Sequence, residues 1–114
     1  MKYTMKLGAI TLTAALMLGT ASSAETTEYL REGSETIQVI KQNGKLYCRR
    51  VSDGYEMCNG MVEQADGTWQ GRKMKHPDMP GFMKFRGTVT FKSTGLSIKG
   101  CAIGICDTEN WTKK

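Results

Sequence analysis

The only histidine of the chain lies in a short segment that is rich in methionine, and these residue types together can bind copper. Within ten residues the sequence places Met74, His76, Met79 and Met83. Thioether sulfur combined with imidazole nitrogen suits copper(I), so one hypothesis is a copper(I) site in residues 74–83. In the competing interpretation, Met74 and Met83 fill irregular gaps in the interior of the fold, and His76 is solvated. The sequence favours this second interpretation.

Catalytic chemistry has few candidate residues here. A hydrolase needs a nucleophile with an oriented base, and only Asp78 lies near His76 in the sequence. Asp53, Asp66 and Asp78 occupy turn sequences, where aspartate commonly bonds its own backbone. Two carboxylates from distant segments could still meet in the fold, which the sequence does not decide. We expect a protein that is not an enzyme and needs no cofactor.

The four cysteines, Cys48, Cys58, Cys101 and Cys106, all follow the leader described below. An even number in a short exported chain predicts two disulfides, for which three pairings exist. We favour Cys48–Cys58 and Cys101–Cys106, because each pair would close a turn between predicted strands. The spacing is not that of a usual zinc finger.

Residues 1–24 are predicted to be a signal peptide. Lys2 and Lys6 precede an apolar stretch at 7–19, and small residues at 21–24 suit cleavage after Ala24. The mature chain, residues 25–114, would then be a single domain in the periplasm, with no membrane span. Without the leader there are 14 basic and 11 acidic groups, a formal charge of +3. The cations are scattered, which is typical of solvated strand faces and not of a nucleic-acid site.

The mature sequence predicts an all-β fold. Short β-branched and aromatic segments alternate with turn signals about every ten residues, and Asn43-Gly44 favours a type I′ hairpin. We expect a loosely held terminus or short edge strand at 25–35, a proline loop at 75–81, and a bulge or bend at Gly87 in a strand running over 82–91. Seven or eight such strands predict a small antiparallel up-and-down meander that closes into a disulfide-stapled barrel.

From about Gly44 the chain resembles an exported bacterial family, domain-of-unknown-function family 2147 (DUF2147). The resemblance is carried by Lys45-Leu46-Tyr47-Cys48-Arg49-Arg50, Cys58-Asn59-Gly60-Met61, Trp69-Gln70-Gly71, Pro77-Asp78, Gly87-Thr88-Val89, Leu96-Ser97-Ile98-Lys99-Gly100-Cys101, Cys106 and Glu109-Asn110-Trp111-Thr112. It implies a lipocalin-like (calycin-like) barrel and no particular enzyme activity. The Gly-x-Trp that commonly opens such domains is missing around residues 29–33.

A barrel of this kind offers a binding site at its mouth. Tyr47, Trp69, Phe85 and Trp111 are the candidate ligand-binding residues, although a small barrel also fills its interior with its own side chains. We expect a monomeric, non-catalytic binding protein of the periplasm, whose partner is a small apolar ligand or an envelope protein.

Overall fold

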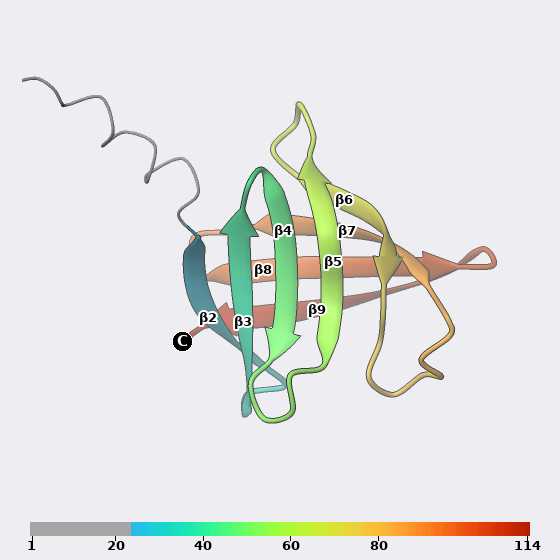
Figure 1. The fold of residues 1–114 in the computed structure, drawn as a ribbon, viewed down its shortest axis with the longest axis horizontal. Coiled ribbons are helices and arrows are strands. Elements are labelled where there is room, and N and C mark those ends of the chain that lie inside the picture. Colours follow the sequence, from blue (N-terminus) through green and yellow to red (C-terminus); the bar gives the residue numbers. More distant parts are fainter. Residues whose placement is uncertain (1–23) are drawn as a thin grey trace, which may run out of the picture.

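The computed structural model describes residues 24–114, which form eight strands joined by turns and loops (Figure 1). The predicted signal peptide lies outside the described residues except for Ala24. No helix that could cross a membrane is found in the described part of the chain. The strands are β2 (Glu25–Arg31), β3 (Glu35–Gln42), β4 (Lys45–Arg50), β5 (Glu56–Glu63), β6 (Trp69–Met74), β7 (Phe85–Phe91), β8 (Gly95–Ala102) and β9 (Ile105–Lys113).

Each strand pairs antiparallel with the next, and β9 pairs with β2, so the sheet is a closed up-and-down barrel. The prediction of an all-β barrel is therefore confirmed. The expectation of a loose terminus or edge strand at 25–35 was wrong, because β2 is a full strand with a partner on each side. The buried residues of β2 are Tyr29 and Arg31. A strand is usually recognised by apolar residues alternating with polar ones, and a charged residue at a buried position breaks this pattern.

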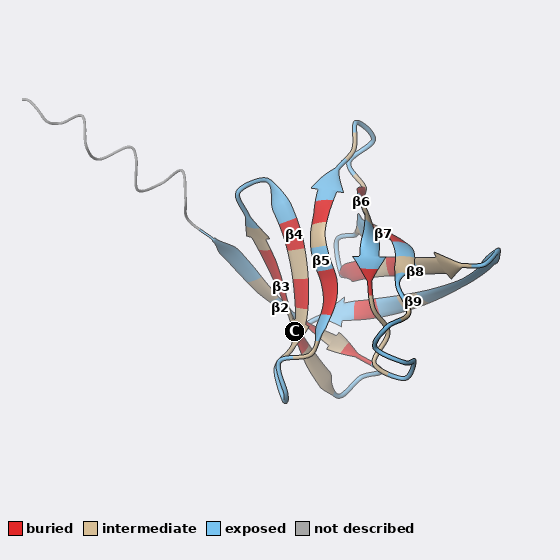
Figure 2. Ribbon diagram, turned by 45° about the vertical axis from the view of Figure 1, so that its right-hand side comes forward, coloured by how far each residue is buried: buried red, intermediate tan, exposed pale blue. Residues whose placement is uncertain are grey.

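The barrel interior is filled by side chains. Figure 2 shows the buried positions alternating along the strands, as expected where one face of a sheet forms the core. Met74 occupies a notch beside Gly87 and Gly100, where an added Cβ would collide with its thioether. The side chains that are almost completely buried include Trp111, Ile37, Leu46, Met61, Leu96 and Val89.

Two disulfides join neighbouring strands, as predicted. Cys48–Cys58 links β4 to β5 inside the core, and Cys101–Cys106 links β8 to β9. The loops that they close are 10 and 5 residues long. Loops of this length restrict the unfolded chain enough to stabilise the fold by about 2–3 kcal/mol each.

The structure also corrects the prediction for the region around Gly87. β7 begins at Phe85, so residues 82–84 belong to the loop that follows β6. Gly87 pairs regularly with Gly71 and Gly100, and the irregular register lies between Gly71 and Met74 in β6. The bulge is therefore on the neighbouring strand.

Three hairpin turns have left-handed backbone at two successive residues, which are Glu32-Gly33, Asn43-Gly44 and Ile103-Gly104. In the predicted turn, Asn43 and Gly44 have φ values of 54° and 75°, which both residue types adopt readily. In the β8–β9 turn the corresponding residues are Ile103 and Gly104, with φ values of 54° and 76°. A β-branched side chain disfavours this conformation, and Ile103 is 93 % exposed, so packing does not compensate for the strain.

We expect Ile103→Asn to stabilise the barrel by about 1 kcal/mol, because asparagine tolerates left-handed backbone better than isoleucine does. Urea unfolding of the two proteins measures the difference. Asn43→Ile, the reverse change in the other hairpin, should destabilise by a similar amount. Equal unfolding midpoints for Ile103→Asn and the wild type would contradict the assignment of strain to this turn.

Candidate functional site

The largest apolar hollow that we describe lies between the 75–84 loop and the β8–β9 hairpin, and has a volume of about 500 Å³. We call it the rim groove. Met79, Met83 and Phe85 line one side, and Ala102, Ile103 and Ile105 line the other. His76 and Asp107 supply its polar groups. An apolar hollow of this size with a few polar groups has the character of a small-molecule site.

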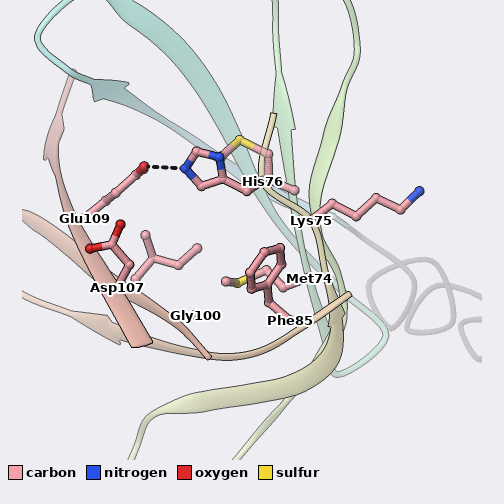
Figure 3. A pocket seen from close by; sticks show the side chains of 9 residues that line it. Met74, Lys75, His76, Phe85, Gly100, Asp107 and Glu109 are labelled. Carbon is pink, nitrogen blue, oxygen red and sulfur yellow. Dashed lines mark hydrogen bonds and ion pairs between the residues drawn. The ribbon is translucent and has the colours of Figure 1, made fainter. Parts of the chain in front are cut away.

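A smaller recess of about 50 Å³ extends from the rim groove towards the barrel interior (Figure 3). The two hollows share His76, Phe85, Gly100 and Asp107. Met74 and Phe85 lie side by side along this recess, whereas the Lys75 ammonium points away from it. The recess has room for only one or two waters, so a larger ligand would lie mainly in the groove.

His76 fastens the 75–84 loop to the barrel. Its Nε2 is 3.1 Å from Glu109 Oε2, and its Nδ1 accepts a hydrogen bond from the Asp78 backbone N–H at 3.1 Å. Because Nδ1 is an acceptor, the proton of the neutral ring lies on Nε2 and is donated to Glu109. The Lys75 N–H also donates to the Met57 carbonyl, and the Tyr55 hydroxyl donates to the His76 carbonyl. The groove therefore has a fixed wall.

Glu109 accepts hydrogen bonds from three side chains. Arg31 donates to both of its oxygens, at 2.8 and 3.0 Å, and Trp111 Nε1 donates at 3.0 Å. With His76 as the third donor, these bonds lower the pKa of Glu109 to about 2, and the contact with Arg31 is the main cause. A carboxylate held this firmly in its charged form is a poor proton acceptor near neutral pH.

Arg31 is the buried centre of a wider ion-pair network. Its side chain is 4 % exposed, and its Nη1 donates to Glu35 at 2.8 Å. Glu35 also accepts from Arg50, which forms a two-bond pair with Asp53 at the surface. The hydrogen bond from Arg50 is the main reason why the pKa of Asp53 is lowered to about 2.

The candidate ligand-binding residues are dispersed in the structure. Phe85 alone lines the rim groove. Trp69 and Trp111 belong to the core, with 6 % and 2 % exposure, and Tyr47 lies with Lys45 and Arg72 around a shallow hollow on the outer wall. The groove residues that the sequence analysis missed include the apolar Ala102, Ile103 and Ile105 and the carboxylate of Asp107. The available signal in the sequence was that apolar residues occupy the β8–β9 turn and both of its flanks.

The candidate copper ligands divide between the two hollows. His76, Met79 and Met83 line the rim groove, whereas Met74 lines the recess beside His76. Both ring nitrogens of His76 already have hydrogen-bond partners, so copper would have to displace Glu109 or the Asp78 amide. No three histidine, cysteine, aspartate or glutamate side chains gather as a metal site within residues 24–114. The copper(I) site stays a prediction.

No family model, curated protein or solved structure matches the chain in a comparison with each of these groups. The resemblance to domain-of-unknown-function family 2147 therefore also stays a prediction.

Arg31→Leu should destabilise the fold by about 3 kcal/mol, because it leaves Glu109 and Glu35 without their buried partner. Urea unfolding followed by tryptophan fluorescence measures the loss. Arg72→Leu is the matched control, since Arg72 is exposed and has no described ion pair, and it should change stability by less than about 0.5 kcal/mol. Similar losses in the two variants would show that the network does not hold the barrel together.

Acid should destabilise the protein as Glu109 becomes protonated. Its pKa is about 2 in the folded protein and 4.5 ordinarily, so its contribution is complete above about pH 4.5 and is lost as the pH falls towards about 2. Urea midpoints measured across this range should decrease. In Glu109→Gln the decrease should be smaller, whereas in Glu63→Gln, at an exposed position, it should match the wild type. An unchanged decrease in Glu109→Gln would contradict this assignment.

Proposed function

We propose that this protein is a non-catalytic binding domain for a small apolar ligand, which it holds in the rim groove. The observation that carries the proposal is the contrast between the groove, at about 500 Å³, and the recess, at about 50 Å³. A ligand the size of a fatty acid or a small aromatic compound fits the first and not the second. The site therefore lies at the rim of the barrel, outside its interior.

The groove also suggests the shape of the ligand. Methionine supplies an adaptable apolar surface on one wall, and the aliphatic residues of the hairpin face it. Asp107 and His76 lie where the groove meets the recess. A molecule with an extended apolar part and one hydrogen-bonding end would match this arrangement.

The polar groups at the groove favour binding over catalysis. Glu109 is held charged by Arg31, and both nitrogens of His76 have partners. Glu109 and His76 are therefore not arranged to accept a proton from a nucleophile. The two disulfides are consistent with an oxidising compartment, and the predicted leader would deliver the chain to the periplasm.

Titration with the uncharged fluorophore N-phenyl-1-naphthylamine tests the proposal. We expect saturable fluorescence enhancement with one probe per chain. Met83→Asp should weaken binding roughly tenfold or more, because it places a carboxylate against the apolar probe. Met83 lies in a loop and is only half-buried, so the barrel should still fold.

Two matched variants make this test specific. Met83→Leu preserves apolar volume and should bind nearly as well as the wild type. Tyr47→Ser alters the outer wall and should leave the affinity unchanged. Absence of saturable binding, or an equal loss in Tyr47→Ser and Met83→Asp, would refute a ligand site in the rim groove.

A further inference from the structure

Exposed apolar side chains are concentrated on two neighbouring segments of the molecule. Of the six large apolar residues that are exposed within residues 24–114, four lie in the 75–84 loop and the β8–β9 hairpin. These four residues are Met79, Phe82, Ile103 and Ile105, and we call them the apolar tip. Phe82 is 84 % exposed and Ile105 is 75 % exposed. The hairpin extends beyond the rest of the barrel in both views (Figures 1 and 2).

The backbone at the apolar tip adds a second observation. Ile103 has a left-handed conformation that an isoleucine disfavours, and it makes almost no contact within its own chain. Neither the turn nor the core of the barrel benefits from an isoleucine at this position. Strain at an exposed position is expected where the side chain has a role in a contact outside the chain.

The strands next to the apolar tip carry an excess of positive charge. Between Asp66 and Asp107 the sequence has seven lysine and arginine residues and one acidic residue, Asp78. The Asp78 carboxylate faces Arg31 and His76, while Asp107 is exposed on β9. The exposed cations on β6, β7 and β8 are Arg72, Lys73, Arg86 and Lys99. None of them has an ion-pair partner among the described residues.

We propose that the apolar tip and these cations dock the protein on the surface of an anionic phospholipid bilayer. Interfacial proteins bind in this manner, with apolar side chains inserted at the acyl boundary and cations near the phosphates. Arg86 pairs with Cys101, one position before the end of β8, so a cation lies close to the hairpin turn. Charge complementarity therefore selects the anionic bilayer as the occupant of this surface.

Docking would also place the rim groove at the lipid surface, because the same two segments line the groove. Docking does not require an occupied groove. Docking can therefore fail while ligand binding is confirmed, and ligand binding can fail while docking is confirmed. Phe82 separates the two proposals, since it belongs to the apolar tip and does not line the groove. Phe82→Ser should weaken docking and leave binding of the fluorescent probe unchanged.

Flotation of the mature chain, residues 25–114, with lipid vesicles tests docking. We expect the protein to float with vesicles made of equal parts phosphatidylglycerol and phosphatidylcholine, and to bind pure phosphatidylcholine roughly tenfold less.

Ile103→Asn combined with Ile105→Thr should reduce flotation roughly tenfold. Because Ile103→Asn is expected to stabilise the turn, unfolding would not account for this loss. Val62→Thr, at an exposed aliphatic position on β5, should bind as the wild type does.

A second pair of variants tests the position of the charge. Arg86→Gln with Lys99→Gln should reduce flotation roughly tenfold or more. Lys92→Gln with Lys113→Gln removes the same charge from a separate hollow, which is also lined by Lys41, and should have little effect. Equal flotation with neutral and anionic vesicles, or equal losses in the two charge variants, would overturn the proposal. Failure to float together with self-association of the wild type would show that the apolar tip binds a second copy instead.

Discussion

The ion pair between Arg31 and Glu109 is the interaction on which both the closed barrel and the rim groove depend. The register between β2 and β9 contains only two residue pairs, and this ion pair joins the same two strands by side chains. A buried guanidinium is stable only when its donors are satisfied, and Glu109 and Glu35 together satisfy it. Glu109 in turn binds His76 and thereby fixes the 75–84 loop. Closure of the barrel and placement of the groove wall therefore share one carboxylate.

A filled interior explains why the candidate site lies on loops. Glycines at 71, 87 and 100 stand next to one another across β6, β7 and β8, and they leave space that Met61 and Met74 occupy. This packing makes the barrel a rigid support and leaves little volume for a ligand inside it. Binding surfaces on such a scaffold are expected in the segments that connect its strands. The long β6–β7 loop and the projecting β8–β9 hairpin are those segments here.

Much of the fold was predictable, because its signals are local. The β-branched residues before Asn43-Gly44 identified one hairpin, and short cysteine spacings identified both disulfides. β2 was not predictable in this way, because Arg31 becomes a core residue only when Glu109, 78 positions later, reaches it. The rim groove has the same origin, since its two walls come from separate segments. Phe85 was predicted as a ligand-binding residue from its type and lines the groove, but nothing local indicated that Ile103 would lie opposite the loop.

The ion-pair network also affects the charge around the rim groove. Glu109 pairs with Arg31, and Glu35 pairs with Arg31 and Arg50, so these carboxylates contribute little net charge near the groove. Asp107, the carboxylate that lines the groove, has no ion pair among the described residues, and the unpaired Arg72 and Arg86 line a separate hollow. The groove therefore matches the proposed ligand, with an apolar part and one hydrogen-bonding end, and no lysine or arginine lines it to bind an acidic end. The pairing that closes the barrel thus also shapes the electrostatic environment of the groove.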